Sequence, residues 1–457
     1  MKKNLLVGLG VIVAIVTMQF VQTEIQASLF DRLTPCAEVG ECNPCDEVAT
    51  SDCDPCGEVD DACYKKKSKW FVNGYLEAGF FANEYGQKSQ YLPNVPNQPY
   101  PERKLVPWSG NTSYLQNVAN TGGQLNQLYI SAGRAVDGKH GLDIGGTVDF
   151  TFGTDARFVQ AAGFEFQYVD YNGGTELDKQ WGSGDYYSAF AQAFIELEYK
   201  RWNVKVGKVY APFGSNSYKS TDRFFYSLAD TYGMVPATAL AAYATYTVNN
   251  RFSIYGGWAQ PDQFGETSED NAFLFGFNWQ ASKRLHIAYA LGSGKNERFS
   301  TVANPNNDIE YFVQSLVTTY KINSKLTSIF DWSLYNISYE QTPPDTNVHS
   351  GIYGINTELI YQYNCRWAFG FRAGWGRDIN DFRYNGDLGY DNKYTFSIGA
   401  NWTPVKWLIV KSELRYDKFE DTKAFNTLLD NGGGAGRDQK ERKTDQFAGG
   451  VSAIVKF

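Results

Sequence analysis

Six of the chain's seven cysteines lie in one short acidic stretch near the N-terminus. They include two C-x-x-C pairs, each with a proline between its cysteines. In a protein that leaves the cytosol, an even number of cysteines in a short, loop-rich stretch indicates disulfide bonds, although the sequence leaves their pairing open. The disulfide candidates are Cys36, Cys42, Cys45, Cys53, Cys56 and Cys63, and Cys365 stands alone far along the chain.

The same cysteines offer ligands for a metal ion. Thiolates bind structural zinc, but the two C-x-x-C pairs are separated by only seven residues, and an oxidising compartment disfavours free thiolates. Haem attachment needs a histidine directly after the second cysteine of a pair, where Asp46 and Gly57 stand instead. Disulfides are the favoured interpretation and zinc is the alternative. No metal or other cofactor is expected.

Residues that could support catalysis are scarce. The only histidines are His140, His286 and His349, which fall at different ends of the expected strands. A nucleophile and its base must lie within hydrogen-bond reach, so this scatter argues against a shared site. The sequence also lacks G-x-S-x-G, H-E-x-x-H and phosphate-binding motifs. We therefore expect a protein that is not an enzyme.

The N-terminus has the pattern of a secretory signal peptide. Two lysines precede the apolar run Leu5 to Val16, which at twelve residues is too short to span a membrane as a helix. The sequence Ile25-Gln26-Ala27 then resembles a cleavage site. We expect residues 1–27 to be removed, with an uncleaved membrane anchor as the alternative. Residues 28–69 would then form an acidic, cysteine-rich periplasmic segment.

The negative charge is concentrated in that segment. Residues 28–63 carry ten acidic side chains and a single base, for a net charge of −9. Residues 64–457 carry 39 basic and 39 acidic side chains, so the larger part of the chain is formally neutral. A neutral domain offers no basic field to a polyanion, which excludes nucleic acid as a partner.

From residue 70 onward, apolar and polar side chains alternate in runs longer than ordinary soluble strands. Aromatic residues make up 16% of the chain, and they favour strands. In Lys406 to Phe419, for example, Leu408 and Leu414 fall on one face while Lys411 and Glu413 fall on the other. The strands expected are 70–83, 125–135, 140–152, 188–200, 202–210, 238–248, 250–260, 270–281, 283–293, 308–322, 324–335, 348–363, 365–376, 389–402, 406–419 and 443–457.

Short and long connections alternate strictly between these strands. Seven are short, and the largest of the others are 84–124, 153–187, 211–237 and 420–442. Transmembrane β-barrels have short periplasmic turns, long extracellular loops and an even strand number. We therefore predict an all-β, up-and-down antiparallel transmembrane barrel of about 16 strands (14 to 18), spanning residues 70–457. The short turns are centred on Asp137-Gly138, Lys200-Arg201, Asn249-Asn250, Ser282, Asn323, Asn364 and Thr403-Pro404.

The last expected strand ends the chain on an aromatic residue. Phe447, Val451, Val455 and Phe457 fall on one face of it. A terminal phenylalanine behind such an alternating strand resembles the signal by which the barrel-assembly machinery recognises its substrates. A final strand also lets the chain's end pair with its beginning, which removes the two free edges that a bilayer would not tolerate.

Two stretches carry a family resemblance. Asn126 to Arg157 reads NQLYISAGRAVDGKHGLDIGGTVDFTFGTDAR, and Ala191 to Tyr226 reads AQAFIELEYKRWNVKVGKVYAPFGSNSYKSTDRFFY. They resemble the OmpL-like outer-membrane β-barrel porin family, known from planctomycetes and other bacteria. The resemblance implies a pore-type barrel over roughly residues 70–457 and implies no catalytic residue. The cysteine-rich segment lies outside the family pattern.

A pore needs only a polar lumen and a constriction. Alternation with the apolar face predicts the pore-lining candidates Arg134, Asp149, Glu196, Glu198, Lys208, Asp331, Arg372, Lys411, Glu413 and Arg415, with a wall that is merely solvated as the alternative. Alternation is irregular around Gly133 and Gly207, where a bulge would turn Arg134 and Lys208 to the other face. The loop Ala211 to Pro236, with Lys219, Asp222 and Arg223, is predicted to fold inward as the constriction, with an exposed loop as the alternative.

Together these features predict a porin in the outer membrane of a Gram-negative-type bacterial envelope, passing ions and small hydrophilic solutes by diffusion. Its partners would be outer-membrane lipid, the barrel-assembly machinery and those solutes, with a homo-oligomer possible in principle. The alternative is a structural barrel, narrow or plugged, that is crosslinked to an envelope partner through disulfides of the cysteine-rich segment. The sequence leaves the solute and its charge open.

Overall fold

The computed structural model describes residues 69–84, 121–161, 164–171, 174–183, 186–261, 272–296, 309–341, 346–379, 390–421 and 443–457. The expected signal peptide and the six clustered cysteines lie outside these described residues. Within the described part, no helix is long and apolar enough to cross a membrane. No group of metal-binding side chains that could hold an ion occurs there either.

Sixteen antiparallel strands form one closed barrel, each paired with its neighbours along the chain. The all-β class, the up-and-down order and the strand number predicted from the sequence are confirmed. The strands are β1 (Trp70–Asn83), β2 (Thr121–Arg134), β3 (Asp143–Gly153), β7 (Tyr186–Tyr199), β8 (Trp202–Tyr210), β9 (Thr238–Asn249), β10 (Phe252–Pro261), β11 (Ala272–Gln280), β12 (Leu285–Asn296), β13 (Ile309–Lys321), β14 (Leu326–Gln341), β15 (Thr346–Gln362), β16 (Trp367–Ile379), β17 (Tyr390–Val405), β18 (Leu408–Phe419) and β19 (Asp445–Lys456).

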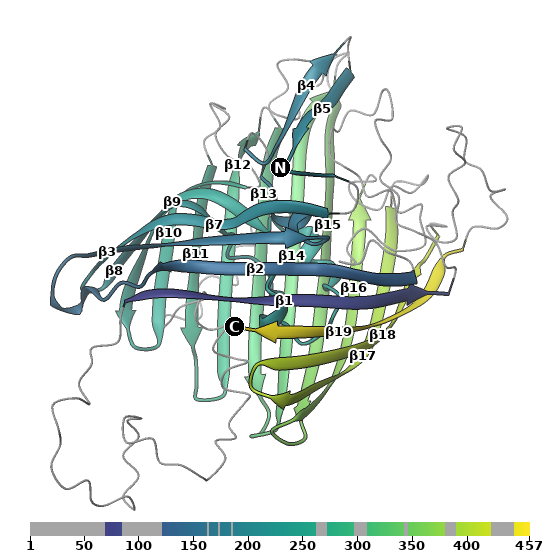
Figure 1. Ribbon diagram of the computed structural model, residues 1–457. Coiled ribbons are helices and arrows are strands. Elements are labelled where there is room, and N and C mark those ends of the chain that lie inside the picture. Colours follow the sequence, from purple (N-terminus) through teal and green to yellow (C-terminus); the bar gives the residue numbers. More distant parts are fainter. Residues whose placement is uncertain are drawn as a thin grey trace, which may run out of the picture.

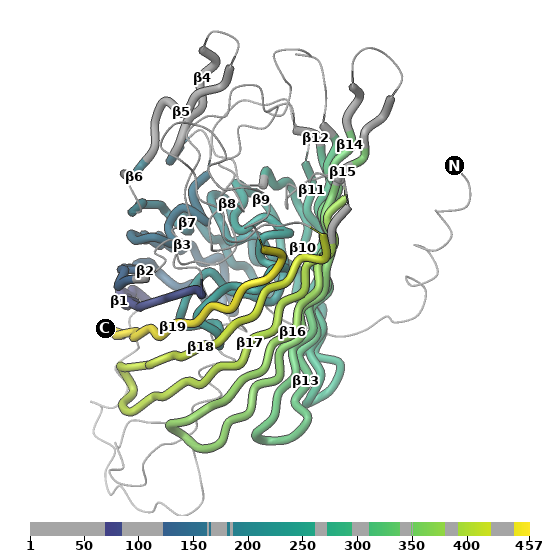
Figure 2. Tube along the Cα trace, turned by 90° about the vertical axis from the view of Figure 1, so that its right-hand side faces the viewer, coloured from purple at the N-terminus to yellow at the C-terminus, as the bar shows by residue number. Residues whose placement is uncertain are grey.

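The first and last strands close the ring. β1 pairs with β19 from Tyr75 opposite Lys456 to Asn83 opposite Ala448, and the two strands lie side by side in Figures 1 and 2. The final residue continues this pairing, because Phe457 exchanges two backbone hydrogen bonds of 2.9 Å with Gly74. Gly74 is needed there, since a Cβ would lie 2.7 Å from the Phe457 ring. Closure leaves neither terminal strand with an unpaired edge in lipid.

The barrel is apolar outside and polar inside. On β18, Leu414 is 63% exposed on the outer face, whereas its neighbour Glu413 is 2% exposed and points into the barrel. On β19, Phe447 and Val451 are exposed while Ser452 is buried. Successive side chains of a strand point to opposite faces, so the alternating sequence sorts the charges inward. This distribution of apolar and polar side chains is the reverse of that in a soluble barrel. It is the distribution expected of a barrel in a bilayer.

The turn between β17 and β18 differs from the prediction. β17 continues through Pro404 to Val405, and the turn is Lys406-Trp407 instead of Thr403-Pro404. The pairing shifts register between Trp402 and Val405. Proline has no backbone N–H for the ladder, and a bulge is one of the few places in a sheet that accept it. Pro404 therefore marks a bulge and not the turn.

The connection between β3 and β7 was expected to be a loop and contains further structure. A short 3-10 helix η3 (Ala156–Val159) follows β3, and β4 (Phe166–Tyr171) then forms a separate hairpin with β5 (Gly174–Gln180). The two-residue strand β6 (Gly182–Ser183) pairs with β7. Figure 1 shows the hairpin projecting beyond the barrel wall. Its strands are too short to match the spanning length used to find the others, so the sequence did not reveal them.

Candidate functional site: the barrel lumen

A long segment between β8 and β9, residues 211–237, lies inside the barrel; we call it the inner segment. It includes the 3-10 helices η4 (Ser220–Asp222) and η5 (Asp230–Met234), and most of its residues are buried. Its polar groups bind inward-facing side chains on both sides of the lumen. Ser220 donates to Glu77 of β1, for example, while Ser215 donates to Asp331 of β14 at 2.8 Å.

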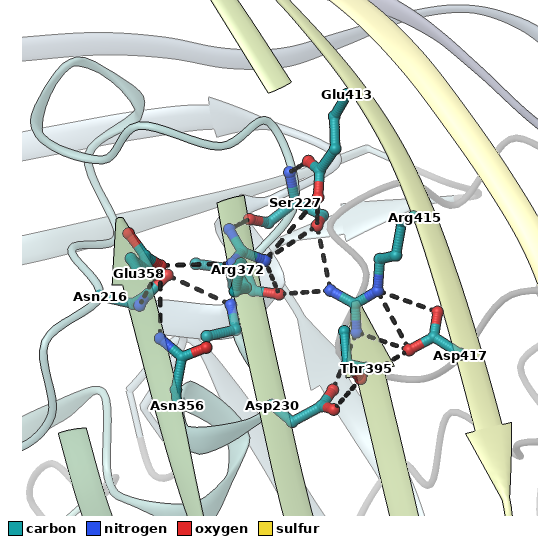
Figure 3. Close-up of polar contacts among 12 residues, drawn as sticks. Asn216, Ser227, Asp230, Asn356, Glu358, Arg372, Thr395, Glu413, Arg415 and Asp417 are labelled. Atoms are coloured by element: carbon teal, nitrogen blue, oxygen red, sulfur yellow. Dashed lines mark hydrogen bonds and ion pairs between the residues drawn. The ribbon is translucent and has the colours of Figure 1, made fainter. Parts of the chain in front are cut away.

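Three groups of buried charges attach the inner segment to the wall. The first surrounds Asp230 of η5, whose carboxylate lies 2.6 Å from Lys393 Nζ and 2.9 Å from Arg415 Nη2. Arg415 also binds Asp417 at 2.8 Å, and Figure 3 shows Arg415 between the two carboxylates. Burial alone would raise the pKa of Asp230, but Lys393 and Arg415 together hold it well below its usual value. Asp230 is therefore bound as a carboxylate.

The second group surrounds Ser227. Its backbone N–H and its hydroxyl donate to Glu413 at 2.7 and 2.8 Å, and its carbonyl accepts from Arg372 at 2.9 Å. Arg372 also pairs with Glu358 at 3.2 Å, and its guanidinium stacks 4.1 Å above the Phe225 ring. Figure 3 shows Arg372 and Glu413 beside Ser227, with Glu358 connected to Arg372. One serine of the inner segment thus joins β16 and β18, and Arg372 extends the network to Glu358 of β15.

The third group lies near η4. Lys411 of β18 donates to the carbonyls of Ser220 and Arg223, both at 2.6 Å. The Arg223 guanidinium faces Glu77 at 3.7 Å and Asp155 at 3.9 Å. Asp155 precedes η3, outside the spanning strands. Burial, reinforced by repulsion from Glu77, raises the pKa of Asp155 to about 7 despite Arg223.

Aromatic side chains of the inner segment pack against glycines of the wall. Tyr226 is fully buried beside Phe81, and a Cβ on Gly79 or Gly450 would clash with its ring or hydroxyl. Phe224 occupies the space that Gly370 leaves, since a Cβ there would lie 2.2 Å from its ring. These inward-facing glycines create room for three consecutive aromatic residues, and the sequence analysis did not identify them.

Below the inner segment, toward the short turns, the lumen holds a cavity of about 1850 Å³. Its wall includes Glu196, Glu198 and Lys205 on β7 and β8, with Lys205 Nζ 3.6 Å from Glu196. The inner segment contributes Lys219, whose ammonium lies 5.0 Å from the centre of the Tyr129 ring. Charged groups of both signs therefore meet a space large enough for many water molecules.

The structure places the sequence-predicted residues in three different surroundings. Those that line the cavity are Asp149, Glu196, Glu198, Lys219, Asp222, Arg223 and Lys411. Those that are buried against the inner segment are Asp331, Arg372, Glu413 and Arg415. Lys208 is also buried, where it binds Glu165 at 2.8 Å and the Val159 carbonyl at 2.7 Å.

Arg134 is placed differently from the prediction. It stands opposite Trp70, whose side chain is 71% exposed on the outer face, and it binds Asp143 at 2.9 Å. The pairing of β2 with β1 is regular from Gln127 to Arg134, and Arg134 is in step with Ile130, which is 36% exposed on the outer face. Arg134 therefore belongs to the outer rim of the barrel at the short-turn end.

Several partners of these groups were not singled out from the sequence. They are Glu77, Asp155, Glu165, Asp230, Glu358 and Lys393. Alternation within β15 and β17 could have identified Glu358 and Lys393 as inward-facing, since each lies in step with a neighbouring inward residue. No local signal distinguishes Asp230, whose partner Lys393 is 163 residues away.

A comparison with protein families matches residues 71–457 to a family described as "Putative beta-barrel porin-2, OmpL-like". The chain belongs to this family. The match agrees with the family resemblance noted from the sequence and covers the described barrel from Phe71 to Phe457. Membership implies a location in the bacterial outer membrane. No curated protein matches the chain.

Solved structures with a similar fold are outer-membrane proteins. A loop-deletion mutant of OmpT, an outer membrane protein of Vibrio cholerae, is 9% identical with a TM-score of 0.50, covering 85% of this chain and 99% of that one. The outer membrane channel DcaP of Acinetobacter baumannii is 12% identical with a TM-score of 0.49, covering 85% and 97%. An anion-selective porin from Comamonas acidovorans is 11% identical with a TM-score of 0.45, covering 86% and 100%.

Proposed function

We propose that the protein is a non-enzymatic channel of the bacterial outer membrane, through which ions and small hydrophilic solutes diffuse passively. The observation that carries the proposal is the charged cavity of about 1850 Å³ inside a barrel whose outer face is apolar. A water-filled lumen with polar walls needs no reacting group to pass a solute. Family membership supports the same function.

The proposal includes two further contacts. The apolar outer face would lie against outer-membrane lipid, with exposed tryptophans such as Trp202 and Trp407 near the headgroups at the short-turn end. The terminal Phe457, which is 64% exposed, would be the residue that the barrel-assembly machinery recognises. Deleting Phe457 should lower the yield of folded barrel in cells, as measured by heat-modifiable electrophoretic mobility.

Single-channel recording in a planar bilayer tests the channel. The purified protein, refolded in detergent, should give stepwise and long-lived openings, and the reversal potential under a salt gradient should report the dominant lumen charge. A control preparation that has been heat-denatured should be silent. A barrel that is folded yet never conducts would contradict the proposal.

A narrow, structural barrel is the second candidate, and the inner segment is the observation that favours it. Buried ion pairs hold this segment across the lumen, and Cys365 is exposed in the β15–β16 turn at the short-turn end. We propose that such a barrel would be crosslinked to an envelope partner through disulfides. Electrophoresis of envelope extracts, with and without reductant, tests this. A monomer under both conditions excludes intermolecular crosslinking.

A further inference from the structure

The short turns of the barrel carry an excess of positive charge. Each of the seven short connections holds at least one exposed lysine or arginine, and Asp137 is the only acidic residue among them. We call these nine residues the turn cations. They are Lys139, Lys200, Arg201, Arg251, Lys283, Arg284, Lys325, Arg366 and Lys406. Because all seven connections lie at the same end of an up-and-down barrel, the turn cations form a ring around its mouth.

A repeated turn geometry sets the position of several turn cations. Asn249, Asn323 and Asn364 each accept a hydrogen bond, through the side-chain oxygen, from the backbone N–H of the cation two residues later. Ser282 does the same for Arg284 at 3.2 Å. Asparagine and serine side chains stabilise tight turns in this way. The turn therefore holds the backbone of each cation at an equivalent place on the rim.

In the part of the chain that the structure describes, the turn cations have no acidic partner, unlike the buried bases that form ion pairs inside the barrel. The buried bases Lys208, Lys393 and Arg415 all form ion pairs of 2.9 Å or less. Among the residues that the structure describes, none of the turn cations forms an ion pair. Lys200 stacks on the Tyr199 ring, while Lys325 and Arg201 bind only carbonyl oxygens. The ring thus presents uncompensated charge to its surroundings.

The chain carries a matching negative charge next to this ring. β1 begins at the short-turn end, where the Lys69 carbonyl accepts a hydrogen bond of 2.8 Å from Ala135 in the first short connection. Residues 28–63, with their net charge of −9, precede Lys69 by only a few positions. We propose that the ring of turn cations is a docking surface for this acidic, cysteine-rich segment of the same chain.

Covalent attachment favours this occupant over a separate anionic partner. A tethered segment meets its docking surface at an effective concentration of about the millimolar range, whereas a free partner must be supplied from solution. At about 3.3 Å per extended residue, the 36 residues of the segment are long enough to reach any of the seven turns. The charges also nearly balance, since nine turn cations and Asp137 give the ring a net charge of +8.

Carbodiimide crosslinking of the full exported chain tests the proposal directly, because this reagent joins a carboxylate to a lysine amine only when the two are in contact. We expect amide links between acids of residues 28–63 and Lys139, Lys200, Lys283, Lys325 or Lys406, identified by mass spectrometry of the folded barrel. Raising the ionic strength from roughly 0.01 M to 1 M shortens the Debye length from about 30 Å to 3 Å, and it should lower the yield about tenfold.

A variant that combines Arg201→Gln, Arg251→Gln, Arg284→Gln and Arg366→Gln keeps every reactive lysine of the ring. It removes four of the nine positive charges of the turn cations. It should fold, since these side chains are exposed, and its crosslinking yield should fall several-fold. The matched control is Lys418→Gln with Lys443→Gln at the opposite end of the barrel, which should leave the yield unchanged.

Two outcomes would overturn the proposal. One is a folded barrel with no links from residues 28–63 to the turn lysines at low salt. The other is links found only between chains, which a mixture of isotopically labelled and unlabelled protein would reveal. If the barrel instead bound vesicles of anionic lipid through the turn cations, and crosslinks were absent, the ring would be a membrane-binding surface and the assignment to this segment would be wrong.

Discussion

The charged residues of the lumen occupy two contrasting regions. On β15 to β18, Arg372, Lys393 and Arg415 are at most 1% exposed and bind carboxylates or carbonyls on every side. On β7 and β8, Glu196 and Lys205 are partly exposed to the cavity, and their charges are 3.6 Å apart. Both regions follow the same alternating pattern. They differ because the inner segment covers one and leaves the other open to water.

This contrast separates charges that fix a structure from charges that meet a solute. A buried charge requires a partner, since removing one member of a buried pair leaves the other uncompensated at a cost of several kcal/mol. A partly exposed pair contributes at most about 1 kcal/mol, because water already screens it. Substitutions in the two regions should therefore affect different measurements: unfolding in the first and ion selectivity in the second.

The largest effect is expected for Arg415→Ala. This change leaves the buried carboxylates Asp230 and Asp417 with Lys393 as their one remaining cationic partner among the described residues, and it should lower the free energy of unfolding by about 3 to 5 kcal/mol. Urea unfolding in detergent, followed by tryptophan fluorescence, measures it. The matched control is Lys205→Ala on β8, expected to cost less than about 1 kcal/mol. Equal losses of unfolding free energy in the two variants would contradict the difference between the buried and the open charges of the lumen.

A smaller loss is expected where the inner segment packs against glycine. In Gly450→Ala, the new Cβ would lie 2.5 Å from the Phe81 ring and 2.8 Å from the Tyr226 ring, so it should destabilise the barrel by about 1 to 3 kcal/mol. The control is Gly123→Ala on β2, where the space around the new methyl group is open. The same unfolding measurement applies. If both alanines are tolerated alike, Tyr226 is not seated as described.

Asp155 gives the inner segment a dependence on pH. Because burial raises its pKa to about 7 in the folded protein, folding favours the protonated acid. The stability from this group is therefore complete below the unfolded pKa, near 4, and is lost as the pH rises through 7. Asp155→Asn mimics the protonated form. It should remove a decrease in the free energy of unfolding of at most about 1.4 kcal/mol per pH unit between these limits. Thermal unfolding from pH 4 to 8 measures it.

The exposed Asp137→Asn is the control for that experiment, and it should keep the wild-type pH dependence. If the slope survives unchanged in Asp155→Asn, other groups set the pH dependence, and burial beside Glu77 does not raise the pKa of Asp155 as described.

The smallest effect on stability is expected on the open wall. Glu196→Gln should change the free energy of unfolding by less than about 0.5 kcal/mol, because the side chain already meets the cavity. It should nevertheless shift the reversal potential toward anion preference. Lys205→Gln should shift it in the opposite direction. If neither changes selectivity, these charges do not line the conducting path.

The barrel could be predicted from sequence because its signal is local. Period-two alternation sets each face, and long runs such as β13 to β18 need no knowledge of distant residues. Where the signal is weak the prediction was wrong, as for the β4–β5 hairpin and for Pro404, which a bulge accommodates. Arg134 was assigned to the wrong face, because it lies at the end of β2 in step with the exposed Ile130 and not with the buried Ser131.

The lumen site was less accessible to sequence reasoning. Alternation assigns the face of Arg372 or Arg415, but it cannot show that Ser227 and Asp230 of the inner segment will bind them. Those contacts join residues more than 140 positions apart and depend on the closed barrel. That the inner segment forms the constriction of a conducting pore stays a prediction until conductance is measured.

The pairing of β1 with β19 limits the order in which the barrel can form. Leu76 of β1 pairs with Val455 of β19, so the ring cannot close until β19 is available for pairing. Until then β1 keeps an open edge that could pair with another chain. Contacts of such high sequence separation also fold slowly. The state in which this edge is still open is therefore the one most exposed to strand pairing with another chain.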